Sequence, residues 1–299
     1  MEIGRAVRKA VSLIEQAGTS RSPALDAYVL LSHCVRKDRL WCHLNRRGNL
    51  ERQDAITFFD MINRRRAGEP VAYITGRKEF WSREFHVNSH TLIPRPETEL
   101  LVEHALAFLE THSDRHRLIL DLGTGSGIIG VTLALEAKNV TVIATDIDFH
   151  ALETARENAR LHKACDRIQF VKADWLTCFH ARTDSRKNGN SLSGFDLITC
   201  NPPYVAYSEH RELEKNVVNF EPHAALFSRD NGLFHIKALL DKAPDIMLPG
   251  GMLLCETGRN QGKAVKDAAL SAGTFKDVSI IRDYAGHDRL LKAQTVIDQ

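Results

Sequence analysis

The segment Asn201-Pro202-Pro203-Tyr204 combines residue types that could bind a flat, nitrogen-containing group. It follows an apolar run at residues 195–200, which predicts a buried strand. The two prolines fix φ and lack an N–H, and the first of them holds Asn201 in an extended conformation. The segment therefore offers an amide side chain, free carbonyl groups and an aromatic ring on a rigid support. These groups suit an amide or an exocyclic amine, and the alternative is a proline-rich turn without chemistry.

A glycine-rich loop, Asp121-Leu122-Gly123-Thr124-Gly125-Ser126-Gly127, lies between a predicted strand at residues 118–121 and a predicted helix. Glycines let a backbone turn sharply and approach a ligand closely, and the start of the helix favours an anionic group. Asp146 ends the next predicted strand, where a carboxylate can accept hydrogen bonds from ribose hydroxyls. Gly125, Gly127 and Gly130 also satisfy the dinucleotide pattern, but that match alone has little specificity.

Two cofactors fit such a loop, and the residues around it favour S-adenosylmethionine over a dinucleotide. Asp121 stands before the glycines, where its carboxylate suits a ligand that carries an ammonium group. Asp174 and Trp175 follow the third predicted strand and offer a carboxylate and an indole ring to an adenine, with core packing as the alternative for the ring. The predicted cofactor-binding residues are Asp121, Gly123, Thr124, Gly125, Ser126, Gly127, Asp146, Asp174, Trp175 and Asn201.

The composition is that of a globular protein of about two domains. Of the 299 residues, 43% are hydrophobic and 26% are charged, and the net charge of +2 is too small for a protein that binds nucleic acid mainly by charge. No apolar run approaches the roughly 20 residues that cross a bilayer, and the N-terminus has an amphipathic pattern rather than that of a signal peptide. The six cysteines include no Cys-x-x-Cys pair and match no standard zinc spacing, so we predict a reduced, cytoplasmic protein without a metal site.

The elements that must position these residues fall into three predicted regions. Residues 1–70 have helical periodicity and predict a helical N-terminal domain, in which Arg64-Arg65-Arg66 is either a solvated helix end or a contact for an acidic partner or RNA. Residues 71–95 predict a β-hairpin linker. Residues 96–299 alternate strand and helix, which predicts a mostly parallel sheet covered on both faces and ending in a hairpin. Within them, residues 180–194 predict a surface insertion without chemistry. The predicted strands are residues 118–121, 140–145, 168–171, 196–200, 252–255, 277–282 and 289–295.

Several motifs occur in an order that resembles one enzyme family. They are Glu69-Pro70-Val71-Ala72-Tyr73-Ile74-Thr75-Gly76, Phe80-Trp81, Leu92-Ile93-Pro94-Arg95-Pro96-Glu97-Thr98-Glu99, the Asn-Pro-Pro-Tyr segment, Glu221-Pro222-x-x-Ala225-Leu226 and Asp283-Tyr284-Ala285-Gly286-x-Asp288-Arg289. With the glycine-rich loop, they resemble the release-factor glutamine methyltransferases, the HemK/PrmC family, over nearly the whole chain. The chain departs from the family pattern at Ser228-Arg229-Asp230-Asn231-Gly232-Leu233, where members usually have a glycine-rich Asp-Gly-Leu, and in a longer insertion at residues 180–194.

The resemblance implies a fold, a reaction and a partner. The fold is the class I S-adenosylmethionine-dependent methyltransferase fold, a mostly parallel seven-stranded sheet with a C-terminal antiparallel hairpin, preceded by a small all-helical domain that recognises the substrate. The reaction moves a methyl group from S-adenosylmethionine to the side-chain amide nitrogen of the glutamine in the Gly-Gly-Gln motif of class 1 peptide-chain release factors, and it leaves S-adenosylhomocysteine. The partner is therefore a protein, and neither direct contact with nucleic acid nor a membrane is expected.

The same resemblance assigns the Asn-Pro-Pro-Tyr segment to catalysis and substrate binding. Asn201 and the carbonyl group of Pro202 accept the two amide N–H bonds, Tyr204 packs against the flat amide, and Pro203 completes the substrate-binding set. Glu97 and Thr98 either close the site or cap the helix that follows. The alternative function is an N6-adenine methyltransferase acting on DNA or RNA, because the same kind of segment can hold an adenine amino group. A non-catalytic scaffold that binds S-adenosylmethionine is the alternative from outside the enzymes.

Overall fold

The computed structural model describes residues 1–111, 115–179 and 194–296. The predicted insertion at residues 180–194 therefore lies, except for Gly194, outside the described residues. The chain forms two compact units, which we call the helical unit (Met1–Arg77 with Leu213–Glu221) and the sheet unit (Lys78–Glu212 with Pro222–Gln299). Within the described ranges, no helix combines the length and the apolar character needed to cross a membrane.

The helical unit is built from amphipathic helices that each bury one face. In α1, Ile3, Val7 and Ile14 recur at helical spacing and are buried. Gly18 ends this helix in the left-handed conformation, with a φ of 64°, and Pro23 occupies the first position of α2, where its missing N–H has no cost. The helices of this unit are α1 (Ile3–Ala17), α2 (Pro23–Val35), α3 (Arg39–Leu44), α4 (Arg52–Arg66), α5 (Val71–Thr75) and α9 (Lys215–Phe220).

Arg65, the middle residue of the predicted basic cluster, belongs to the interior of the helical unit. The residue is 5% exposed, and its guanidinium donates to the Asp26 carboxylate at 2.7 Å and to the Thr19 carbonyl group at 2.6 Å. The neighbouring Arg64 pairs with Glu69. The cluster is therefore neither a uniformly solvated helix end nor a continuous basic surface, because its central charge is buried and ties the end of α4 to α2.

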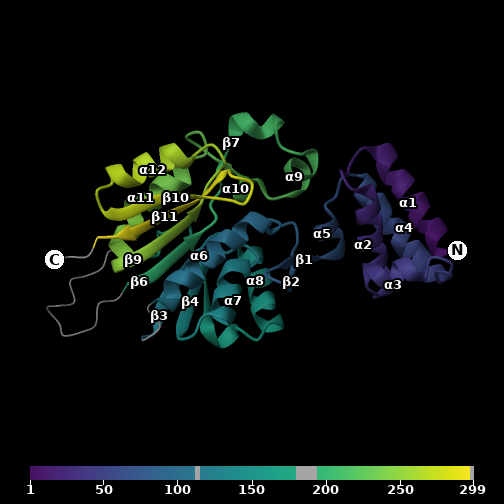
Figure 1. Ribbon diagram of the computed structural model, residues 1–299, viewed down its shortest axis with the longest axis horizontal. Coiled ribbons are helices and arrows are strands. Elements are labelled where there is room, and N and C mark those ends of the chain that lie inside the picture. The colour runs from purple at the N-terminus through teal and green to yellow at the C-terminus, as the bar shows by residue number, and fades with distance from the viewer. Residues whose placement is uncertain (112–114, 180–193, 297–299) are drawn as a thin grey trace. The chain divides into compact units, whose positions relative to one another are not determined.

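The sheet unit contains a seven-stranded sheet in the order β10-β11-β9-β6-β3-β4-β5 (Figure 1). β11 runs antiparallel to both of its neighbours, and every other adjacent pair is parallel. This arrangement confirms the predicted mostly parallel sheet with an antiparallel C-terminal hairpin. The strands are β3 (Arg117–Leu122), β4 (Val140–Asp146), β5 (Ile168–Lys172), β6 (Phe195–Cys200), β9 (Met247–Glu256), β10 (Phe275–Arg282) and β11 (Asp288–Thr295).

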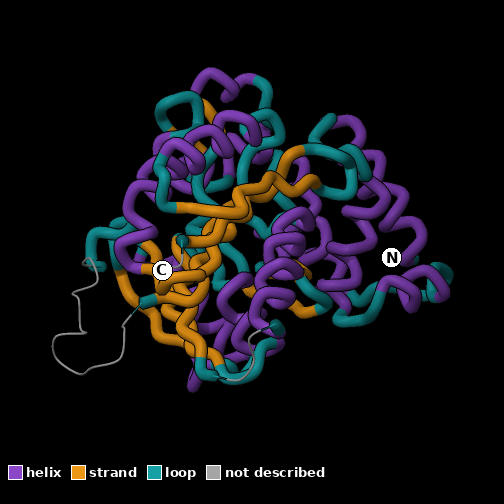
Figure 2. The backbone as a smooth tube through the Cα atoms, turned by 60° about the vertical axis from the view of Figure 1, so that its left-hand side comes forward, coloured by secondary structure: helices purple, strands orange, loops and turns teal. Residues whose placement is uncertain are grey.

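Helices cover both faces of this sheet (Figure 2). Alternate residues of a strand point to opposite faces, so Ile119 and Leu197 join one layer of the core, whereas Leu120 and Ile198 join the other. Burial on both faces explains why the central strands β3 and β6 read as largely apolar runs in the sequence. The first face is covered by α6 (Glu99–Glu110), α7 (Ile128–Glu136) and α8 (Phe149–Leu161), and the second by α11 (Phe234–Ile246) and α12 (Gly262–Ser271).

The region predicted as a hairpin linker, residues 71–95, begins with a helix. Val71–Thr75 forms α5, because Pro70 favours the start of a helical turn and Gly76, with a φ of 70°, ends it. The hairpin that follows is confined to β1 (Arg77–Phe80) and β2 (Arg83–His86). The remaining short elements are the 3₁₀ helices η1 (Pro96–Thr98), η2 (Cys165–Arg167) and η4 (Tyr207–Arg211), the helix α10 (His223–Leu226), and the parallel pair β7 (Val205–Ala206) and β8 (Phe227–Ser228).

Candidate active site

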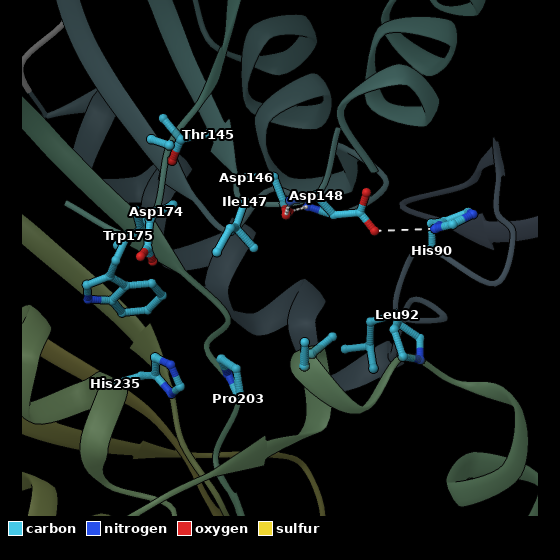
Figure 3. Close-up of a pocket in the computed structure, with 17 residues that line it drawn as sticks. His90, Leu92, Thr145, Asp146, Ile147, Asp148, Asp174, Trp175, Pro203 and His235 are labelled. Carbon is cyan, nitrogen blue, oxygen red and sulfur yellow. Dashed lines mark hydrogen bonds and ion pairs between the residues drawn. The ribbon is translucent and has the colours of Figure 1, made fainter. Parts of the chain in front are cut away.

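A cavity of about 250 Å³ opens at the carboxyl ends of the parallel strands in the sheet unit. The strand order reverses between β3 and β6, and ligands of open α/β sheets bind at such a reversal. The predicted site residues that line the cavity are Gly123, Gly125, Asp146, Asp174, Trp175 and Pro203 (Figure 3). Those outside its lining are Asp121, Thr124, Ser126, Gly127, Asn201, Pro202 and Tyr204.

The glycine-rich loop presents bare backbone to the cavity. Gly123 and Gly125 have φ angles of 69° and 56°, and no atom stands within 4 Å of the place that a Cβ would take on either residue. Their positive φ, rather than crowding, therefore favours glycine. Gly127, with a φ of 83°, has a packing role as well, because a Cβ there would stand 3.0 Å from the Cβ of Ala155 in α8.

Asp121 lies behind the loop and holds its shape. Its buried carboxylate accepts hydrogen bonds from Thr124 Oγ1 at 2.6 Å, from the Gly130 backbone N–H at 3.0 Å and from Thr199 Oγ1 at 3.1 Å. Burial raises the pKa of Asp121 to about 6, although these three hydrogen bonds favour the carboxylate. The acid predicted to face an ammonium group is thus one layer behind the cavity wall.

Asp146 joins the same loop to the end of β4. Its Oδ2 accepts from the Gly125 N–H at 2.9 Å and its Oδ1 from the Asp148 N–H at 3.0 Å, and burial raises its pKa. The carboxylate can still accept a hydrogen bond from a ligand hydroxyl. Beyond it, His90 Nδ1 lies 3.3 Å from Asp148 Oδ2, on the far side of the cavity from Trp175 (Figure 3).

Trp175 and His235 meet edge to face in the cavity wall, with 5.2 Å between their ring centroids. The indole Nε1 of Trp175 and the hydroxyl of Thr145 are buried and have no hydrogen-bond partner among the described residues. Buried polar groups are nearly always paired in folded proteins. Two unpaired donors in one wall therefore favour a polar ligand here. Burial lowers the pKa of His235, so its ring is neutral near pH 7.

The side chains of the Asn-Pro-Pro-Tyr segment are held by residues from distant parts of the sheet unit. Asn201 Nδ2 donates to Thr98 Oγ1 at 3.3 Å, and the Thr98 hydroxyl donates to Glu256 Oε2 at 2.8 Å. The Tyr204 hydroxyl donates to Glu256 Oε1 at 3.1 Å. Asn201 Oδ1 is buried and lacks a partner within the described ranges. Thr98 makes no capping hydrogen bond to α6, so capping is not its role, and Glu97 is exposed.

A second set of contacts holds the backbone of the same segment. Gln261 Nε2 donates to the Tyr204 carbonyl oxygen at 2.8 Å and to the Asn231 carbonyl oxygen at 3.2 Å. Gly232 lies so close that a Cβ there would overlap the Tyr204 carbonyl oxygen. Asp230 and Asn231 precede it with φ angles of 54° and 51°, a left-handed conformation that Asp and Asn tolerate better than most residues. The departure from the family pattern at this loop thus preserves a tight turn.

The sequence patterns did not identify three residues of the site, Glu256, Gln261 and Ile147. Glu256 ends β9 as Asp146 ends β4, so an acid after a predicted strand was an available signal. Ile147 is 57% exposed and lines the cavity, and its position directly after Asp146 in the sequence was a second signal. Gln261 had none, because its partner is 57 residues away in the chain.

Comparison with known proteins identifies the family. Residues 5–76 match the PrmC N-terminal domain, and residues 96–236 match the methyltransferase small domain. A release factor glutamine methyltransferase of Nitratidesulfovibrio vulgaris is 39% identical over 280 residues, which cover 93% of this chain and 90% of that protein. The chain belongs to the release factor glutamine methyltransferase family. The family member from Vibrio cholerae is 40% identical over 296 residues, which cover 98% of this chain and 96% of that protein.

A solved structure shares the fold of this release factor glutamine methyltransferase family member. The catalytic domain of hMettl16, in complex with hairpin 6 of the MAT2A 3′UTR, matches with a TM-score of 0.56, 17% identity and 84% coverage of both chains. At this identity the likeness concerns the fold alone. It confirms the predicted class I methyltransferase architecture.

Proposed function

We propose that this protein transfers a methyl group from S-adenosylmethionine to the side-chain amide nitrogen of the glutamine in the Gly-Gly-Gln motif of class 1 peptide-chain release factors. The observation that carries the proposal is Asn201 Oδ1, a buried acceptor without a partner among the described residues. It lies in the segment whose Pro203 lines the cavity. A buried acceptor on a rigid support suits a substrate N–H, and the family relatives are named as release factor glutamine methyltransferases.

The residues of the cavity fit S-adenosylmethionine in their chemistry. We assign the backbone of Gly123 and Gly125 to its methionine end, Asp146 to its ribose hydroxyls, and Asp174 with Trp175 to its adenine. The unpaired hydroxyl of Thr145 and indole N–H of Trp175 supply further donors in the same wall. When bound, this cofactor supplies a methyl group on a sulfonium, a strong electrophile. The remaining loop positions of the predicted set, Asp121, Thr124, Ser126 and Gly127, support this site from behind the cavity wall.

The protein's part in the reaction is to orient a weak nucleophile. An amide nitrogen reacts poorly because its lone pair is delocalised into the carbonyl group. We assign Asn201 Oδ1 and the Pro202 carbonyl oxygen to the two N–H bonds of the glutamine amide, with Tyr204 against its flat face. Acceptors at these places hold the nitrogen in line and stabilise the positive charge that it develops. Orientation of this kind contributes about 7–11 kcal/mol in favourable cases.

No side chain is needed to remove a proton before the attack. The neutral amide nitrogen keeps both of its hydrogens when it gains the methyl group, so the nitrogen becomes positively charged. A nitrogen-protonated amide is a strong acid, and it loses one proton to water to give the neutral N-methyl amide. Burial and the nearby charge of Glu256 raise the pKa of Tyr204, so its hydroxyl stays protonated and donates to that carboxylate. We therefore assign no catalytic base.

The proposal extends to the parts of the chain and to its place in the cell. We assign residues 1–70 to substrate recognition, residues 71–95 to a linker and residues 96–299 to methyl transfer. The partner is a class 1 release factor, and the reaction then takes place in the cytoplasm, where these factors act. All six cysteines are free thiols, which agrees with a reducing compartment.

Labelled methyl groups test the proposal. The protein is incubated with methyl-labelled S-adenosylmethionine and, in separate reactions, with a class 1 release factor, the same factor with the Gly-Gly-Gln glutamine replaced by alanine, and adenine-containing DNA or RNA. We expect label only in the intact release factor. Label that persists in the glutamine-replaced factor, or that enters nucleic acid alone, would contradict the proposal.

A further inference from the structure

Glu256 is a buried carboxylate with two hydroxyl donors and no assigned role. It is 1% exposed, and it accepts from Thr98 at 2.8 Å and from Tyr204 at 3.1 Å. Thr98 precedes α6 and is 158 residues away in the chain, whereas Tyr204 belongs to the Asn-Pro-Pro-Tyr segment. Burying a carboxylate is unfavourable unless hydrogen bonds and charge compensate. Because the buried Glu256 carboxylate lies close to the proposed substrate acceptor, Asn201 Oδ1, we expect it to have a function.

The direction of the hydrogen bonds from Asn201 to Thr98 and from Thr98 to Glu256 indicates this function. The Thr98 hydroxyl has a single proton, which it donates in its hydrogen bond to the Glu256 carboxylate, because an ionised carboxylate can only accept. Thr98 Oγ1 can then only accept from Asn201, so Asn201 must present its NH₂ group to Thr98. Its Oδ1 is thereby turned away from Thr98 and left free. Without this constraint the amide could turn over and offer N–H donors to a substrate that also brings N–H donors.

The C-terminal hairpin motif, residues 283–289, joins the same network. Asp283 accepts from the backbone N–H groups of Ala285 and His287, each at 3.0 Å, and pairs with Arg289 at 3.2 Å. Burial raises the pKa of Glu256, and the charge of Arg289 opposes that rise. The turn of the hairpin thus holds a cation that favours the ionised Glu256.

We propose that Glu256 and Thr98 are positioning residues for methyl transfer, which together fix the Asn201 amide so that Oδ1 faces the substrate nitrogen. The inference rests on the proposed function, because it concerns an acceptor for the substrate N–H. In this arrangement, the buried Glu256 carboxylate links three motifs that are far apart in the sequence, at Thr98, Asn201 and Arg289.

Thr98→Val and Thr98→Ser test this inference as a pair. Valine removes the hydroxyl at nearly constant volume, and serine keeps it. We expect Thr98→Val to lower kcat about tenfold, as for one lost hydrogen bond in an oriented network. The dissociation constant of S-adenosylmethionine should stay unchanged, and Thr98→Ser should retain kcat. The matched control is Thr132→Val in α7, where a buried hydroxyl donates only to its own helix, at the Ile128 carbonyl, and kcat should not change.

A double-mutant cycle separates positioning from general destabilisation. If Thr98 acts through Asn201, then Thr98→Val should cause no further loss of kcat in the Asn201→Ala background. Glu256→Gln should behave in the same way, because a glutamine amide can donate to Thr98 and release the constraint. Multiplicative losses in the double variants, or normal kcat in Thr98→Val, would overturn the inference. Wild-type protein that methylates no release factor would instead refute the proposed function, so the two failures are distinct.

Discussion

At the scale of single residues, the proposed reaction depends on the difference between an acceptor and a donor at Asn201. Its Oδ1 is buried without a partner in the described part of the chain, while its Nδ2 is held by Thr98. Pro202 and Pro203 stiffen the backbone beside it whatever side chain stands at residue 201. Removing the amide should therefore remove the acceptor without unfolding the segment.

Asn201→Ala should lower kcat about 100- to 1000-fold, the range seen when one oriented polar group is deleted from an active site. The dissociation constant of S-adenosylmethionine should change little, because the cavity-lining residues remain. Steady-state kinetics and calorimetry measure the two quantities. Near-normal turnover would refute the role of Asn201.

Asp121 carries a prediction about pH. Its pKa is raised from the ordinary 3.8 to about 6, so the folded state binds more protons than the unfolded state between these values. Its contribution to stability is therefore complete below the unfolded pKa and is lost as the pH rises through about 6. From about pH 5 to about pH 8, the unfolding free energy of the wild type should fall by about 1 kcal/mol relative to that of Asp121→Asn. Urea titrations at both pH values measure this difference, and parallel pH dependences would contradict it.

At the scale of elements, the Asn-Pro-Pro-Tyr segment is placed by the loop before α11. Gly232→Ala would bring a Cβ into the Tyr204 carbonyl oxygen and the Gln261 side chain, at a φ of 84°. Gly273 is the matched control, since its φ of 69° is also positive, no atom lies within 4 Å of a Cβ there, and it lies outside the network around Glu256. Both variants should lose about 1 kcal/mol from backbone strain. Only Gly232→Ala should also lower kcat, and equal kinetics in the two variants would show that the contact does not place the segment.

The sequence predicted best the helices and strands that are marked by a pattern of neighbouring residues. Short apolar runs identified β3, β4, β5, β6 and β9, because strands covered on both faces are rich in apolar residues. The strands β10 and β11 are less apolar and were predicted as a C-terminal hairpin. Helical spacing alone does not identify the inward face of the N-terminal helices. Leu25 and Ile56 recur at helical spacing with core residues, yet each is 48% exposed, whereas Phe58 is buried. Spacing fixes which residues share a face, but neighbouring helices decide which face is covered.

The residues of the candidate site also differ in whether a local sequence pattern identifies them. Asp146 and the glycines could be found because a strand, a tight turn and a helix follow one another directly in the chain. The residues that hold the Asn-Pro-Pro-Tyr segment could not be found in this way, because Thr98 and Glu256, which hydrogen-bond to each other, are 158 residues apart in the sequence. Asp121 shows the intermediate case, since its place in the sequence suggested a ligand contact, while its three internal hydrogen bonds appear only in the folded chain.

At the scale of the whole molecule, two units of different construction share one chain. Sequence patterns separate a helical part from an α/β part, since their hydrophobic periods differ. The compact units divide at Arg77, and the helical unit also takes in Leu213–Glu221. No periodic pattern reveals that return of the chain, because it depends on packing between residues far apart in sequence. Our proposed domain limits at residues 70 and 95 follow the local pattern alone.

Mass spectrometry of the release factor can locate the transferred methyl group. A class 1 release factor is incubated with S-adenosylmethionine and either the wild-type protein or Asn201→Ala, and the peptide that contains Gly-Gly-Gln is sequenced by fragmentation. We predict one methyl group on the side-chain nitrogen of that glutamine with the wild type and almost none with Asn201→Ala. An unmodified glutamine with the wild type, or a methyl group on a different residue, would contradict it.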